Sequence, residues 1–509
     1  HINGLILARE RVFVKGGASI IPLTGYGSII NYQTIDEAIM AMQKTYSADS
    51  RTIHLWAVGG MADYMLFVAF NALILPIFTT GFGLSPVLVG WALMIPRVFD
   101  AFVDPVIGHM SDNLRTRWGR RRPFLLGASV LGAFLVMSLW WPSRAWPQSL
   151  QFAYLLVNSI LLFICYGAFS MTHVALGYEL SDDYHLRTKV VAVRAFYFSM
   201  AALCGGWLYW LALRPVFGSE IVGIRWVSAG MAAVILVAGL IPVVACRERF
   251  QNPHPRHVHL WTAVRTTLAI RPFVVVLLLR IAQTLGSSLY GALSFYIGAY
   301  CVCGGDKSLF TSLAGINGII GFLISLALVP ASARLSRQLG KRRGLIWSFG
   351  ASFVGALLLP VFARAGHPYL FLLHMVVFFG AVNLVLTMFM ASVMPDICDI
   401  DELASGERRE GLFSAVMSFV SKIENSICML MGGYMVAFSG FNTHLAQAMV
   451  QQPDWVLHRL RWLAFTPFIV FTGLAFVLAC FFPITQRTMD EVRRRLDERR
   501  TARATEVAV

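Results

Sequence analysis

Apolar residues along this chain gather into runs of roughly 20 residues, the length at which an α-helix crosses a bilayer. The runs predict twelve membrane-spanning helices, at residues 55–80, 86–110, 123–141, 150–178, 190–213, 226–246, 272–300, 309–330, 344–363, 368–394, 411–437 and 463–483. A polar stretch from Arg247 to Arg271 contains two prolines and separates the first six runs from the last six. The pattern therefore predicts an all-α, polytopic membrane protein built from two six-helix bundles.

This reading divides the chain into five parts. We expect an N-terminal extension that is cytoplasmic or artefactual (1–53), followed by an N-terminal bundle (54–246) and a cytoplasmic interdomain loop (247–271). A C-terminal bundle (272–483) and a basic cytoplasmic tail (484–509) complete the chain. In the tail, Thr488 to Arg500 places Met489, Val492 and Leu496 on one side of a helix. We expect that helix to lie on the inner leaflet through its apolar side.

Composition removes other classes of protein. The chain is 57% hydrophobic and 14% charged, whereas a soluble domain is about 25% charged. Its net charge of +15 lies in short loops between apolar runs, where cations orient a membrane protein, and no nucleic-acid recognition fold accompanies it. The eight cysteines form no CxxC pair, which favours small buried side chains over a metal site.

The same cations predict the topology. With the N-terminus in the cytoplasm, 31 lysines and arginines fall on the inner side and seven on the outer side. Cytoplasmic loops of membrane proteins carry the excess of these residues. We therefore expect a multi-pass protein of the plasma (inner) membrane with both termini inside, and a monomer.

The two halves share a loop motif. Gly119-Arg120-Arg121-Arg122 follows the second span, and Gly340-Lys341-Arg342-Arg343 follows the eighth. The glycines lie 221 residues apart, at matching positions of two six-helix halves. The repeat predicts a duplicated transporter, as in the major facilitator superfamily.

The second span carries Arg97, Asp100 and Asp104, whose spacings of three and four place them on one helical face. Ionisable groups at this depth indicate function, because their burial in lipid is costly. Two close carboxylates raise the proton affinity of one of them or attract a cation. We interpret Asp100 and Asp104 as cation ligands; the alternative is an Arg97–Asp100 salt bridge that only braces the helix.

Further polar side chains are candidates in other spans. Lys422 could reach the acidic pair across the cavity, or be satisfied within its own helix. Arg194 could bind a solute through the paired N–H donors of its planar guanidinium, or its side chain could extend to the inner membrane surface. Asp63 could accept hydrogen bonds from a polyol, or pair with an arginine of a neighbouring helix. The remaining candidates for solute binding are Tyr166, Ser170, His173 and Ser418.

A third group concerns the inner face. Asp396, Asp399 and Asp401 are expected in an inner loop, where pairing with basic loops explains them better than a metal cluster does. We assign gating and contacts between the halves to Asp112, Gly119, Arg120, Arg121, Asp396 and Asp399.

The motif Arg97-Val-Phe-Asp100-Ala-Phe-Val-Asp104-Pro, continued by Asp112 and Gly119-Arg-Arg-Arg-Pro-Phe, resembles the glycoside–pentoside–hexuronide:cation symporters, the family of the melibiose permease. Tyr178-Glu-Leu-Ser-Asp182, Met394-Pro-Asp396 and Phe482-Pro-Ile-Thr485 agree with it. The resemblance implies an alternating-access symporter for a glycoside, oligosaccharide or uronide. It also implies that Asp100 and Asp104 bind the cation, that Arg194 contacts the sugar and that Lys422 lies near the cation.

The fourth span departs from that family. Residues 150–178 hold no Asp, Glu or Trp, whereas the family's fourth helix supplies a carboxylate and a sugar-packing tryptophan. Losing a carboxylate weakens a Na⁺ cage, so we expect H⁺ ahead of Na⁺ as coupling ion, with no other cofactor or metal. The alternatives to a sugar symporter are a lysolipid or other amphiphile carrier, a non-transporting membrane sensor and an integral membrane enzyme.

Overall fold

The computed structural model describes residues 49–114, 116–178, 180, 184–246, 265–406, 409–448 and 450–508. The predicted N-terminal extension, apart from its last residues, and most of the interdomain loop lie outside this part of the chain. The described part is almost wholly helical, and its long helices follow the predicted spans in order.

The N-terminal half begins with a first span of five consecutive segments: α2 (Ser50–Ala57), α3 (Gly59–Val68), η1 (Ala69–Leu73), α4 (Ile74–Ile77) and η2 (Phe78–Phe82). It continues through α5 (Pro86–Asn113), α6 (Arg122–Ser138), α7 (Gln148–Tyr178), α8 (Tyr184–Ala212), the short turn η3 (Pro215–Phe217) and α9 (Glu220–Ala245). Proline stands at the first turn of α5 and α6, where its missing N–H costs nothing.

The C-terminal half repeats this plan. Its elements are α11 (Arg271–Tyr296), η4 (Ile297–Val302), α12 (Lys307–Leu339), α13 (Lys341–Phe362), α14 (Pro368–His374), η5 (Met375–Val382), α15 (Asn383–Ser405), α16 (Glu410–Phe438), α17 (Thr443–Gln447), α18 (Asp454–Cys480) and α19 (Gln486–Ala508). Nine spans in the described part are long and apolar enough to cross a membrane, and α6 is a shorter apolar helix. The charged helices α5 and α16 complete the twelve.

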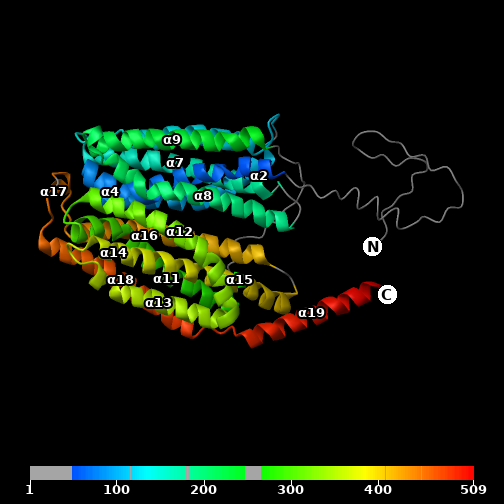
Figure 1. Cartoon of the computed structure of the whole chain (residues 1–509). Helices are drawn as coiled ribbons and strands as arrows, with labels where there is room; N and C mark the ends of the chain where they lie inside the picture. The colour runs from blue at the N-terminus through cyan, green and yellow to red at the C-terminus, as the bar shows by residue number, and fades with distance from the viewer. Residues whose placement is uncertain are drawn as a thin grey trace.

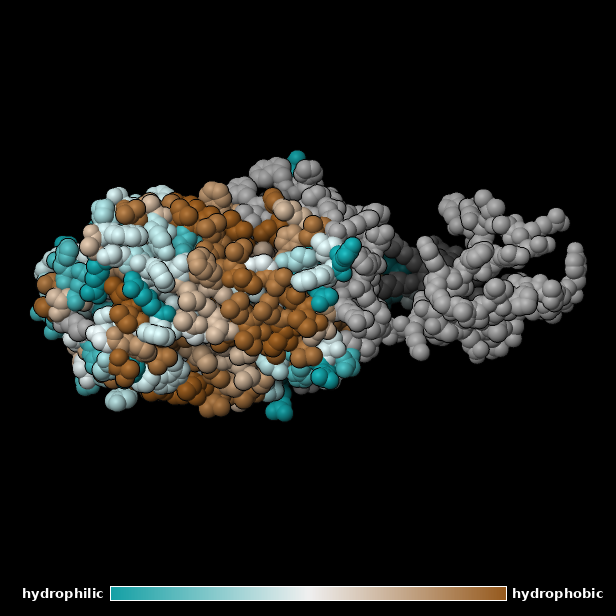
Figure 2. Space-filling model, turned by 90° about the horizontal axis from the view of Figure 1, so that it is seen from above, coloured by the Kyte–Doolittle hydropathy of each residue, from teal (hydrophilic) through white to brown (hydrophobic). Residues whose placement is uncertain are grey.

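The helices run side by side, with α17 at one end of the molecule and α2, α15 and α19 at the other (Figure 1). We call these the α17 end and the terminal end. Figure 2 shows apolar side chains over the middle of one face, with hydrophilic ones gathered toward the α17 end. A polytopic membrane protein has this distribution, because its middle contacts lipid.

The halves meet along α5 with α16 and along α8 with α12. Glycines permit the close approach at both crossings. A Cβ on Gly433 would lie 2.3 Å from the Pro86 carbonyl oxygen, and one on Gly206 would lie 2.8 Å from that of Ala314. Both crossings fall in the parts of the helices near the α17 end.

The buried apolar side chains are distributed along the molecule in the same way as these crossings. One core cluster joins the halves and includes Phe78, Tyr209, Tyr296 and Phe441. The part of the C-terminal half near the terminal end has a separate cluster, which includes Phe273, Phe413 and Leu496. Among the described buried side chains, the core that the halves share therefore lies toward the α17 end.

The tail helix differs from its prediction in one respect. Met489, Val492 and Leu496 are buried in the C-terminal cluster, and α19 packs on α15. The apolar side therefore covers protein, and the expectation that it lies on the membrane is wrong. The sequence pattern gave the apolar side correctly but not the surface that it meets.

Candidate cation and solute site

The expected contact between the second and eleventh spans is present. Lys422 of α16 places Nζ 3.0 Å from Oδ2 of Asp100 on α5. The Asp100 side chain is 11% exposed and that of Lys422 is 26% exposed, so the pair is neither at the surface nor fully enclosed. Asp104 follows one turn after Asp100 on α5, but its side chain lies outside the described part.

Arg97 extends from the same helix toward the first span. Its guanidinium donates a hydrogen bond to the Asn71 side-chain oxygen in η1. It also lies 5.5 Å from the ring centroid of Phe163, within cation–π range. Asn71 completes its own hydrogen bonding by donating to the Phe67 carbonyl at 3.0 Å. Arg97 therefore ties α5 to the interior of the N-terminal half.

Asp63 pairs with Arg194, the alternative reading that the sequence left open for Asp63. The Arg194 guanidinium of α8 donates to Asp63 Oδ2, and Asp63 is 2% exposed. Its other oxygen, Oδ1, has no hydrogen-bond partner among the described residues. Buried carboxylate oxygens are normally paired, and the nearest side chain that could serve Oδ1 is Ser170.

His173 holds Arg194 in place. Arg194 Nε lies 3.4 Å from His173 Nδ1, and His173 Nε2 lies 2.9 Å from the Trp56 carbonyl oxygen. Because Nδ1 faces a donor and Nε2 faces an acceptor, the ring is the neutral tautomer with its proton on Nε2. The ring stacks between Trp56 and Phe169, at 4.8 and 5.5 Å between centroids. His173 is fully buried and reaches a solute only through Arg194.

The other predicted residues divide into two groups. Tyr166 is an electrostatic neighbour of Asp63, Arg97 and Asp100, and Ser170 lies beside Asp63. Tyr166 and Ser170 thus lie between the Asp63–Arg194 pair and the cluster of Arg97 and Asp100. Ser418 is exposed and stands one turn before Lys422 on α16. The Asp100–Lys422 contact joins this cluster to the other half.

A cavity of about 370 Å³ lies between the halves, displaced toward the α17 end. Its polar lining comes from residues of both halves: Asn71, Tyr209, Ser288, Ser294, Thr311 and Asn425. No functional role was predicted for these residues from the sequence, and none of the predicted solute-binding residues lines this cavity. Single hydroxyl and amide groups in apolar spans carry little signal, because hydrogen bonds between helices explain them equally well.

Glu424 is another group to which the sequence gave no role. It is 5% exposed, and both its carboxyl oxygens lack hydrogen-bond partners among the described residues. It stands one turn from Cys428, which lines the cavity. Among the described residues, His, Cys, Asp and Glu nowhere gather in threes to hold a metal ion.

The two repeated loops, at Gly119 and Gly340, share a backbone feature. Gly119 and Gly340 have φ of 107° and 76°, values that favour glycine, and each lies just before a helix. Arg121 donates to the Ala175 carbonyl at 2.8 Å and Arg122 bonds the Val243 carbonyl. These contacts stay within the N-terminal half. Arg120 also has interaction partners, and the side chain of Asp112 is not described.

Asp396, Asp399 and Asp401 lie on a helix and not in the loop that the sequence suggested, because α15 continues through Pro395 to Ser405. Asp396 pairs with Lys341 at 2.7 Å and with Arg493 at 3.2 Å. These partners offset the cost of the buried carboxylate. Both belong to the C-terminal half, so these two contacts tie α15 to α13 and α19. Asp399 also has partners, and a role in gating stays a prediction.

Known proteins resemble the chain over most of its length. Residues 55–486 match a family described as MFS/sugar transport protein. A glucuronide carrier protein homolog of Escherichia coli is 25% identical, over 88% of this chain and 96% of that protein. A putative glycoside/cation symporter of the same organism is 24% identical, over 88% and 95%. A xylose transporter of Escherichia coli, solved in an inward-open conformation, covers 87% of this chain and 98% of its own at TM-score 0.57 and 15% identity, a likeness of fold alone.

Proposed function

The chain belongs to the family of MFS/sugar transport proteins, and from that premise we propose how it carries out cation-coupled symport of a sugar-like solute. Transport is its activity, and it is not an enzyme. The names of its relatives favour a sugar over the lysolipid alternative. The solute class is a glycoside or uronide, and the coupling ion is H⁺ ahead of Na⁺.

The cation acts at the contact between the halves. Asp100 accepts a hydrogen bond from the Lys422 ammonium at 3.0 Å. A proton or Na⁺ at Asp100 and Asp104 competes with that ammonium, because a carboxylate that is neutralised attracts Lys422 less. Loading therefore weakens the Asp100–Lys422 contact between α5 and α16. The strength of the contact between α5 and α16, two helices that must move past each other, thus depends on whether the cation is bound.

The solute binds at the Asp63–Arg194 pair in the N-terminal half. Asp63 is buried beside Arg194, and when the site opens, its carboxylate accepts from a sugar hydroxyl while the Arg194 guanidinium donates to a hydroxyl or a uronate carboxylate. Tyr166 lies between this pair and the Arg97–Asp100 cluster. The observation that carries the proposal is the Asp100–Lys422 ion pair across the interface between the halves, with the buried Asp63–Arg194 pair in the N-terminal half beside it.

Uptake into proteoliposomes tests the proposal. Candidate solutes are glucuronides and pentosides, each supplied with an imposed proton gradient, a sodium gradient, both or neither. We expect accumulation to need a gradient and to be lost in Asp100→Asn and Asp104→Asn. Glu498→Gln neutralises an exposed carboxylate of α19 and serves as the matched control. Accumulation that persists in both aspartate variants would sink the coupling assignment.

A further inference from the structure

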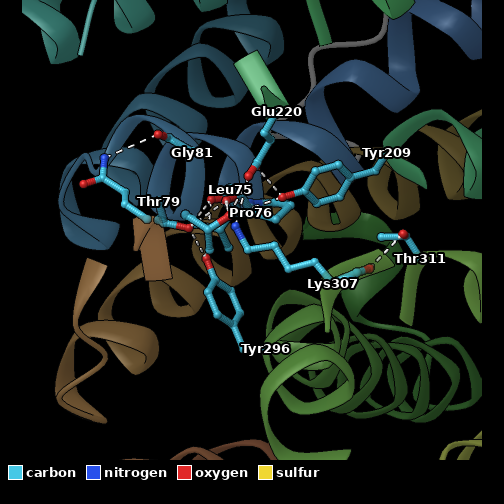
Figure 3. A network of polar contacts seen from close by, with 11 residues as sticks. Leu75, Pro76, Thr79, Gly81, Tyr209, Glu220, Tyr296, Lys307 and Thr311 are labelled. Atoms are coloured by element: carbon cyan, nitrogen blue, oxygen red, sulfur yellow. Dashed lines mark hydrogen bonds and ion pairs between the residues drawn. The ribbon is translucent and has the colours of Figure 1, made fainter. Parts of the chain in front are cut away.

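A second polar network joins the halves, and the transport site does not include it. It lies toward the α17 end, on the far side of the cavity from the Asp100–Lys422 pair. At its centre, Lys307 Nζ lies 3.0 Å from Glu220 Oε2. Glu220 begins α9 in the N-terminal half and Lys307 begins α12 in the C-terminal half. Figure 3 shows the lysine side chain reaching from α12 toward this carboxylate.

The pair is enclosed, and both oxygens of its carboxylate have partners. The side chains of Lys307 and Glu220 are only 8% and 5% exposed. Tyr209 donates to Glu220 Oε1 at 2.6 Å, and the Thr80 hydroxyl lies 3.5 Å from the same oxygen. Each carboxylate oxygen thus has a partner, which a buried charge requires.

The position of Lys307 is costly for α12 itself. Asp306 caps the helix by accepting from the Leu309 N–H at 2.9 Å, so that Lys307 is the first helical residue. A cation at a helix N-terminus is disfavoured by the helix dipole, and its burial adds a desolvation cost. Nothing within α12 offsets these costs, whereas Glu220 of the other half does.

Neutral contacts between the halves surround the ion pair. The hydroxyls of Thr79 and Tyr296 lie 2.6 Å apart, and Gln447 of α17 donates to the Gly81 carbonyl at 3.3 Å. The network also borders the cavity, since Tyr209 and Thr311 line it and Thr311 donates to the Lys307 carbonyl at 2.8 Å. Opening of the α17 end must separate the Thr79–Tyr296 and Gln447–Gly81 contacts together with the ion pair.

We propose that Glu220 and Lys307 form a latch between the two halves, which holds the α17 end closed and breaks each time that end opens to the cavity. In the closed state the two buried charges compensate each other. In the open state water solvates each one. Removal of one partner leaves the other charge buried and uncompensated only in the closed state, so the balance shifts toward the open state.

Distances between spin labels in lipid nanodiscs test the latch. The label sites are Val216→Cys in the N-terminal half and His458→Cys in the C-terminal half, both exposed near the α17 end, with the exposed Cys204 and Cys480 replaced by serine. In Glu220→Gln and in Lys307→Met we expect the ratio of long to short distances to rise roughly a hundredfold, the effect of breaking a buried pair.

Two further variants make the test specific. The double variant Glu220→Gln/Lys307→Met leaves no uncompensated charge, so its shift should be smaller than that of either single variant. Arg225→Met removes a cation that bonds the Trp140 carbonyl at 2.9 Å, at the same end but within one half, and should leave the distances unchanged.

The latch is overturned if both single variants give the distance distribution of Arg225→Met, or if the double variant shifts it as far as the two single shifts added together. Should Lys307→Met fail to fold, Glu220→Gln decides alone, because glutamine keeps the shape and hydrogen bonding of the site. The readout needs no solute and no coupling ion, so it is independent of the proposed symport.

Discussion

At the residue scale, the site depends on side chains that hold other side chains in place. His173 is buried between two rings and bonds Arg194. The sequence identified His173 as a candidate because a histidine inside a span is unusual. It did not indicate that the ring contacts Arg194 and Trp56 instead of a solute. Those partners belong to α8 and α2, and they approach His173 only when the helices pack.

Arg194→Lys tests the geometry of this cluster. The guanidinium bonds Asp63 through one nitrogen and His173 through another, and a single ammonium cannot reach both groups. We expect the apparent KM for the solute to rise about tenfold or more, with little change in thermal stability. Arg364→Lys, at an exposed arginine, is the control. An unchanged KM in Arg194→Lys would remove Arg194 from the solute site.

Gly59→Ala tests the packing on His173. A Cβ at Gly59 would lie 2.5 Å from His173 Nε2, so the ring must move and lose its bond to the Trp56 carbonyl. Overpacking of this kind costs about 1–3 kcal/mol, and we expect a lower midpoint of thermal unfolding in detergent. Gly127→Ala, where nothing lies within 4 Å of the added carbon, should keep or raise that midpoint. Equal midpoints for the two variants would contradict the packing.

At the element scale, the helices begin and end mostly where the sequence indicates, because their lengths are set by the bilayer and by caps. The exceptions are α12 and α15, whose predicted spans end at residues 330 and 394, whereas the helices continue through Pro330 to Leu339 and through Pro395 to Ser405. Ion pairs from α13 and α19 hold Asp396 in α15. Such support comes from residues far apart in the sequence, so local pattern could not predict it.

Leu496→Ala tests the packing of α19 on the C-terminal half. Leu496 is 5% exposed and belongs to the core of that half. Truncation of a buried leucine costs about 2–5 kcal/mol, so the unfolding midpoint should fall. Arg495→Ala, at a side chain that is 59% exposed, should change stability by about 0.5 kcal/mol or less. If both variants unfold alike, α19 does not pack on the bundle.

At the scale of the whole molecule, the described contacts between the halves gather near the α17 end. A shared apolar core, two glycine crossings and the Glu220–Lys307 pair lie on the closed side. The Asp100–Lys422 pair lies between this closed side and the terminal end. An alternating-access transporter closed at one end has this arrangement.

Orientation in the membrane is a prediction at this scale. The excess of cations at the terminal end places that end in the cytoplasm. In a background with Cys204 and Cys480 replaced, a membrane-impermeant maleimide should label Val216→Cys in intact cells. It should label Thr488→Cys, on the exposed side of α19, only after permeabilisation. The opposite pattern would reverse the topology.

The sequence by itself determined the class of protein, the order of the spans, the duplication and the charged face of α5, because each follows from local hydropathy, charge or spacing. It left open whether Lys422 reaches the acidic pair of α5 or is satisfied within its own helix, and the packing of α16 on α5 decided for Asp100. Only the tertiary structure decided that Arg194 pairs with Asp63, that α19 covers protein, and that Glu220 meets Lys307. The physical reason is that these contacts join residues separated by up to 131 positions, and their partners become neighbours only when helices pack.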